Sequence, residues 1–172
     1  MHTSSLQENF IAELDHELTN TRRILERVPF DKADYQPHPR SMKLAQLASH
    51  IVNLLSFKTL FLQSDSRDVM DPNLVKPGPT PTSLDELLAR FDQYSAELRQ
   101  ALQDSDDEKM THNFKLTRGE QVMISQPKGA ALRLMGFNHS IHHRGQLTVY
   151  LRLLDVPIPG FYGPSADDKL PG

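Results

Sequence analysis

The chain has 172 residues, no cysteine and no tryptophan, and its 19 Lys and Arg against 22 Asp and Glu give a formal net charge of −3. This length fits one domain with a core of its own, and the missing cysteine excludes disulfides, thiolate nucleophiles and iron–sulfur clusters. The nearly balanced charge argues against nucleic acid as the main partner. In a chain without thiols, the eight histidines are the best remaining ligands for a transition metal.

Neither a targeting segment nor a membrane span is recognisable in the sequence. Residues 1–18 lack the basic stretch and the unbroken apolar run of a signal peptide. No window contains the ~18 consecutive apolar residues that a spanning helix requires. We therefore expect a soluble, cytoplasmic protein with a single domain over residues 1–172.

Four segments with apolar residues at helical spacing predict helices. The first covers residues 5–28 and the second residues 43–63. The third begins at Ser83, where Glu86 three residues later completes a capping-box pattern. The last runs from residue 128 to residue 154 and ends before Pro157. No strands alternate with these helices, so the sequence predicts an all-α fold, a four-helix bundle with long connections.

The connections are less regular than the helices. Residues 72–81 are too rich in proline for a helix or a central strand and predict an extended loop. Residues 111–125, on either side of Arg118 and Gly119, fit either a short hairpin or an irregular loop. The tail from residue 160 onward is typical of a loop.

Two histidines on the last predicted helix lie one turn apart. His139 and His143 share a helix face with Leu147, so both side chains point toward the interior and can converge on one ion. His50 lies in the apolar stripe of the second helix, between Leu47 and Leu54. If these two helices are neighbours, the three imidazoles form a metal site with at least one open ligand position.

Structural explanations compete with this interpretation. Histidines four residues apart arise by chance on helix surfaces, and a single histidine such as His50 on an apolar face is more often hydrogen-bonded to a carbonyl. Three inward-facing histidines together would each need a partner for their buried nitrogens, which favours the metal site. His142 lies about 100° around the helix from His143 and is a weaker candidate. The remaining histidines are expected to be solvated or in loops: His2, His16, His38 and His112.

Other catalytic motifs are absent. Ser140 stands where the HExxH metalloprotease motif has its glutamate. The glycine-rich loops of nucleotide-binding proteins and the Gly-x-Ser-x-Gly motif of hydrolases do not occur. The pair of Glu-x-x-His motifs that a di-iron carboxylate site uses is missing as well, since only Glu13 and His16 have this spacing.

The whole chain resembles the DinB/YfiT-like superfamily, the damage-inducible DinB family of metal-dependent enzymes. The resemblance lies in the order of the helices, in KLAQLASHI around His50, and in NHSIHHRGQLTVYLRLLDVPIPGFYGPSADD from Asn138 to Asp168. It implies a four-helix bundle, usually a homodimer, that binds a divalent metal, typically nickel or zinc, through His50, His139 and His143. Arg144, Gln146 and Tyr150 become candidates for supporting roles, with Gln146 able to orient a ligand or a metal-bound water.

Some relatives in this superfamily are transferases or isomerases that use small thiols such as bacillithiol or mycothiol. The leading functional hypothesis is therefore a metal-dependent transferase that activates a low-molecular-weight thiol, or water, toward a small-molecule substrate. A metal-dependent hydrolase, a non-catalytic metal-binding stress-response protein and a helical interaction module with core histidines remain open alternatives.

Overall fold

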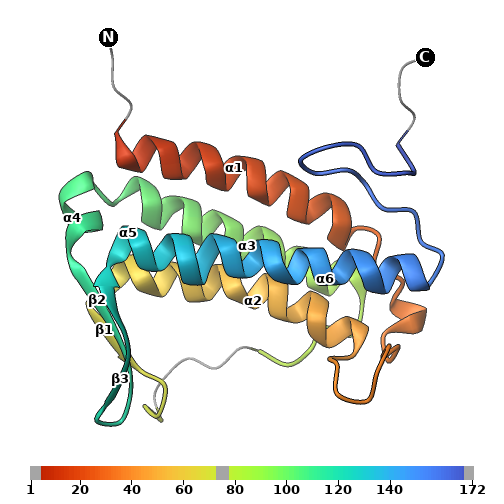
Figure 1. Cartoon of the computed structure of the whole chain (residues 1–172), viewed down its shortest axis with the longest axis horizontal. Coiled ribbons are helices and arrows are strands. Elements are labelled where there is room, and N and C mark those ends of the chain that lie inside the picture. The colour runs from red at the N-terminus through yellow and green to blue at the C-terminus, as the bar shows by residue number, and fades with distance from the viewer. Residues whose placement is uncertain (1–4, 73–77, 169–172) are drawn as a thin grey trace.

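Long helical stretches lie side by side in the computed structural model, which describes residues 5–72 and 78–168 (Figure 1). Helix α2 packs against both α3 and α6, and α1 packs against α3 and α6, so the apolar faces meet in one core. The long helices are α1 (Leu6–Leu25), α2 (Leu44–Gln63), α3 (Leu84–Gln103) and the last stretch, α5 (Lys128–Ala131), the π-helix η2 (Leu132–Asn138) and α6 (His139–Leu153).

The helices begin where the sequence provides caps. Ser5 and Glu8 form a complete capping box at the start of α1. The capping box expected at α3 forms only in part. The Ser83 hydroxyl accepts a hydrogen bond from the Glu86 backbone amide, whereas the Glu86 carboxylate accepts from the Thr82 amide instead.

The all-α prediction is wrong at one end of the molecule, where three strands form a small sheet beside the short helix α4 (Asp107–Thr111) (Figure 1). The hairpin alternative for residues 111–125 is confirmed, with Gly119 in the left-handed region at φ 58°. Phe114 and Leu116 point into the core, which anchors the hairpin on the helices. The strand order is β1 (Ser66–Asp68), β2 (Asn113–Arg118) and β3 (Gln121–Pro127), with β1 parallel to β2 and β2 antiparallel to β3.

The last helical stretch is continuous but changes its winding before the histidines. Residues 132–138 form π-helical turns, and α6 starts at His139. A Cβ atom at Gly136 would lie 3.0 Å from Cγ of Lys58 and 3.3 Å from Cδ1 of Leu132, so a larger residue would require these side chains to shift by a few tenths of an ångström. Irregular turns of this kind are frequent at functional sites.

The loop between α1 and α2 is tied to its surroundings at several points. It contains the 3-10 turn η1 (Phe30–Lys32), and the amides of Leu44 and Ala45 donate to the carbonyls of Tyr35 and Ala33. The Tyr150 hydroxyl of α6 donates to the Met42 carbonyl over 2.9 Å. The end of this loop is therefore fixed beside α6.

Two further predictions concern the proline-rich loop and the absence of a membrane span. Part of the proline-rich loop expected at 72–81, residues 73–77, lies outside the described residues, and 78–81 is non-helical as predicted. Among the described residues, no helix is both long and apolar enough to cross a membrane.

Candidate metal centre

The structure brings together the three histidines that the sequence singles out. His50 comes from the first half of α2, and His139 and His143 come from the first two turns of α6. One nitrogen from each ring lies within 4.8 Å of the nitrogens of the other two. The His50 ring centre is 4.4 Å from that of His143 and 5.5 Å from that of His139. Since α2 and α6 are neighbours, the condition for convergence of the three rings is met.

Gln146 determines which nitrogen of His143 is available to a ligand. Its Oε1 atom, which can only accept, lies 2.7 Å from His143 Nδ1, so Nδ1 carries the proton. The Nε2 atom of His143 then presents a lone pair to the other histidines. The sequence suggests that Gln146 orients a ligand or a metal-bound water, and the structure places it in direct contact with the ring of His143, one of the candidate ligands.

The His139 ring faces the other nitrogen of His143. The Nε2 atoms of the two rings lie 2.9 Å apart. The nearby Met135 carbonyl favours protonation of the His139 ring. Among the described residues, however, no hydrogen-bond partner is found for Nδ1 of His139. A proton on Nδ1 leaves two lone pairs facing each other, an arrangement that a cation between them stabilises. Two imidazoles sharing one tetrahedral zinc ion have nitrogens about 3.3 Å apart. The donor set therefore fits a divalent ion.

Burial keeps all three imidazoles neutral. It lowers the pKa of His50 to about 4, with the nearby His143 and His139 adding to the effect. Burial is also the main cause of the lowered pKa of His139 and of His143. Neutral imidazole is the form that binds metals, so the group is prepared for an ion at neutral pH.

The other histidines lie apart from this group. His142 is exposed, and its ring centre is 4.9 Å from that of His143, on the outer side of α6. His16, His38 and His112 are exposed, as predicted for solvated or loop residues. His2 lies outside the described residues.

Arg144 and Tyr150 have contacts that the sequence does not reveal. Arg144 is only 2% exposed and points away from the histidines, to an ion pair with Glu17 of α1 over 2.6 Å. It also donates to the hydroxyl of Tyr162 in the C-terminal tail, which in turn donates to Glu17. The structure therefore places Arg144 in a buried link between α1, α6 and the tail, whereas the Tyr150 hydroxyl, bonded to Met42, fixes a loop.

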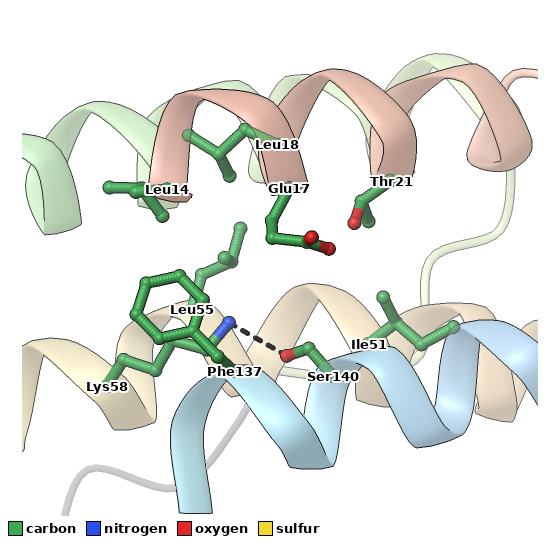
Figure 2. Close-up of a pocket in the computed structure, with 9 residues that line it drawn as sticks. All are labelled: Leu14, Glu17, Leu18, Thr21, Ile51, Leu55, Lys58, Phe137 and Ser140. Atoms are coloured by element: carbon green, nitrogen blue, oxygen red, sulfur yellow. Dashed lines mark hydrogen bonds between the residues drawn. The ribbon is translucent and has the colours of Figure 1, made fainter. Parts of the chain in front are cut away.

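A buried cation next to the histidines was missed by sequence reasoning. Lys58 of α2 is 3% exposed, and its Nζ atom donates to the Ser140 hydroxyl over 2.8 Å. Figure 2 shows Glu17 of α1 pointing into the same small pocket as this pair. Burial lowers the pKa of Lys58 to about 7, although Glu17 acts in the opposite direction. The only signal in the sequence is a lysine that continues the apolar stripe of Ile51 and Leu55.

An open cavity borders the histidine group on its other side. Its volume is about 420 Å³, and His143 and Gln146 form part of its wall. Of the three candidate ligands, His143 belongs to its lining. Its lining consists of Arg40, Ser41, Met42, His143, Gln146, Val149 and Tyr150.

Two curated relatives match most of the chain. The chain is 25% identical to the uncharacterized protein YrdA of Bacillus subtilis over 165 residues, which is 94% of this chain and 90% of YrdA. It is 28% identical to the uncharacterized protein YjoA of the same organism over 132 residues, 77% of this chain and 80% of YjoA.

Two crystal structures share the fold. One is of the DinB-like protein YjoA from Bacillus subtilis, with a TM-score of 0.71 and 19% identity, covering 91% of this chain and 99% of that one. The other is a DinB-like protein from Bacillus cereus, with a TM-score of 0.71 and 24% identity, covering 90% of this chain and 97% of that one. The model of the DinB family matches residues 1–169. The chain belongs to the DinB family and has its fold, mostly helical with a small three-stranded sheet.

Proposed function

We propose that this protein is a metal-dependent enzyme that activates a small thiol at a centre formed by His50, His139 and His143. The helical stretches would act as a four-helix bundle that holds these ligands. The observation that carries the proposal is the convergence of three neutral imidazole nitrogens within 4.8 Å, one of them from His143 in the wall of an open cavity. Three protein ligands and an open side are typical of catalytic metal sites, whereas closed sites use four.

Nickel or zinc suits this donor set, because borderline metals prefer neutral imidazole and the chain offers no thiolate. When bound, such an ion supplies a Lewis acid that lowers the pKa of a thiol or water. Contacts within the chain prepare the histidines to bind the ion. Gln146 holds the His143 ring in one tautomer, and burial keeps His50 free of a competing proton.

The Tyr150 hydroxyl already donates its proton to the Met42 carbonyl. We therefore assign Tyr150 to the wall of the cavity, where it positions the loop. It does not act as a proton donor in this arrangement. The cavity wall supplies the space in which a thiol and an electrophilic substrate can meet.

The test is an assay of the purified, metal-reloaded protein with an electrophile such as 1-chloro-2,4-dinitrobenzene and, separately, with p-nitrophenyl acetate. Each is offered with and without a small thiol. Turnover of the electrophile that requires both metal and thiol supports the proposal. Thiol-independent ester cleavage would instead favour metal-dependent hydrolysis. Full metal occupancy without turnover of either compound would favour the non-catalytic metal-binding alternative.

A further inference from the structure

The cavity beside His143 has a cation in its wall but no acid. Its volume of about 420 Å³ lies in the range of small-molecule pockets, which is roughly 300–1,000 Å³. Arg40 is the charged residue of the lining, and neither Asp nor Glu is among the lining residues. An anionic molecule would therefore meet an attractive charge here and no opposing carboxylate.

Arg40 is also the uncompensated cation of its own loop. The neighbouring lysines each face a carboxylate: Lys32 lies 3.8 Å from Asp31, and Lys43 lies 2.6 Å from Asp34. Within the described part of the chain, the Arg40 side chain has no ion-pair partner. The loop thus leaves one guanidinium available to a ligand.

The backbone around Arg40 is held in place. The amide of Arg40 donates to Nδ1 of His38 over 3.1 Å, and the amide of Ser41 donates to the His38 carbonyl over 2.8 Å. Two residues further on, Tyr150 holds the Met42 carbonyl. A fixed backbone lowers the entropy that is lost when the arginine binds a ligand, which favours binding.

The rest of the wall suggests what lies between the anion and the metal centre. Met42, Val149 and the Tyr150 ring present apolar surface, while His143 and Gln146 mark the side of the candidate ligands. Guanidinium binds carboxylate and phosphate groups through two parallel hydrogen bonds. We propose that this cavity binds a small molecule with an oxyanion group on a short apolar linker, anchored by Arg40, and that its other end reaches the three histidines. This inference rests on the proposed function, because it defines the substrate class of the same site.

Thiols of similar length but different charge test the inference. The cobalt-loaded protein is titrated with 3-mercaptopropionate, 2-mercaptoethanol and cysteamine, and binding is followed by the sulfur-to-cobalt absorption band. The readout is the ratio of the dissociation constants for 3-mercaptopropionate and 2-mercaptoethanol, compared between variants so that the thiols' own acidities cancel.

We expect R40Q to reduce the preference for 3-mercaptopropionate about tenfold, the effect of losing one charge-assisted contact. R40K should retain part of the preference, and cysteamine should bind R40Q no worse than the wild type. The matched control is R118Q, an arginine of β2 at the sheet end of the molecule, which should leave the ratio unchanged. An equal ratio in wild type and R40Q would overturn the inference and leave the proposed function standing.

Failure of the proposed function gives a different result, since then none of the thiols produces the absorption band. The inference is in that case decided by NMR titration of the zinc-loaded protein with butyrate and with inorganic phosphate. Shifts of the amides of His38 and residues 40–42 that R40Q abolishes would support an anion site at Arg40, and the more effective anion identifies the group. Absence of such shifts with both anions would overturn it.

Discussion

The Nζ atom of Lys58 lies 2.8 Å from the hydroxyl oxygen of Ser140, the residue that directly follows His139. A buried amine on α2 is thus joined to the turn of α6 that carries a candidate metal ligand. Gly136 leaves room for the Lys58 stem, since a side chain at this position would require the stem to shift by a few tenths of an ångström. Lys58 therefore joins α6 to α2, at the cost of burying an amine.

The first prediction concerns Lys58→Met, which keeps the length of the side chain and removes the amine. In the folded protein the pKa of Lys58 is about 7, well below the unfolded value of about 10.4. Between these pH values the unfolded chain binds a proton that the folded chain has released, so the free energy of unfolding rises with pH. We expect the wild-type slope to exceed that of K58M by up to about 1.4 kcal/mol per pH unit.

Urea unfolding at several pH values from 7 to 10 measures these slopes. The exposed Lys32, replaced in Lys32→Met, serves as the control and should give the wild-type slope. Parallel pH profiles for wild type and K58M would contradict the prediction.

The second prediction concerns acid sensitivity of the metal-free protein. The pKa of His50 is about 4 in the folded state, below the unfolded value of about 6.5. Stability is therefore lost as pH falls through this window, because the unfolded chain takes up the proton first. We expect a steeper loss between pH 6.5 and pH 4 in the wild type than in His50→Gln, measured by urea unfolding in the presence of a chelator. Identical profiles of the two proteins would show that His50 is not held neutral.

The third prediction concerns Gln146, the hydrogen-bond partner of His143 Nδ1. Gln146→Ala removes the acceptor that fixes the tautomer, so metal affinity should fall by about 10–100-fold. Gln146→Glu keeps an acceptor and should restore most of the affinity. Competition with a chromophoric chelator measures the affinities. Gln121→Ala, on the exposed hairpin, is the control, and equal affinity of Q146A and wild type would count against the role of Gln146.

The fourth prediction concerns the buried ion pair of Arg144 and Glu17. Arg144→Met leaves the Glu17 carboxylate, whose side chain is 12% exposed, without its partner. Removal of one partner from a buried pair destabilises proteins by about 3–5 kcal/mol. We expect a loss near the lower end of that range in urea unfolding, and a smaller loss when Glu17→Gln is added. Unchanged stability of R144M would contradict the buried ion pair.

The helices and the convergence of the histidines could be predicted because each rests on a local pattern. Apolar residues at helical spacing, such as Leu14 and Leu98, define the faces that meet in the core. His139 and His143 share a face through their spacing alone. The position of His50 opposite them required a second assumption, that two helices are neighbours, and the resemblance to the DinB family supplied it.

The parts that escaped prediction depend on contacts between distant residues. Strand β1 is three residues long, and Ser66 pairs with Lys115, so no local alternation reveals it. The partner of Arg144 lies on α1, 127 positions away, and nothing in the HHRGQ segment indicates it. Lys58 lies in an apolar stripe, but its role depends on its hydrogen bond to Ser140. The sequence drew attention to Ser140 only because the HExxH motif has a glutamate at that position.

Metal content measures the central claim most directly. Wild type, His50→Gln, His139→Gln, His143→Gln and the neighbouring control His142→Gln are purified without added metal, reloaded with zinc or nickel, and analysed for bound ions. We predict close to one ion per chain in the wild type and in H142Q, and a large loss of the ion in each of the other three variants with their helical content unchanged. Equal metal content in all five proteins would contradict the three-histidine centre.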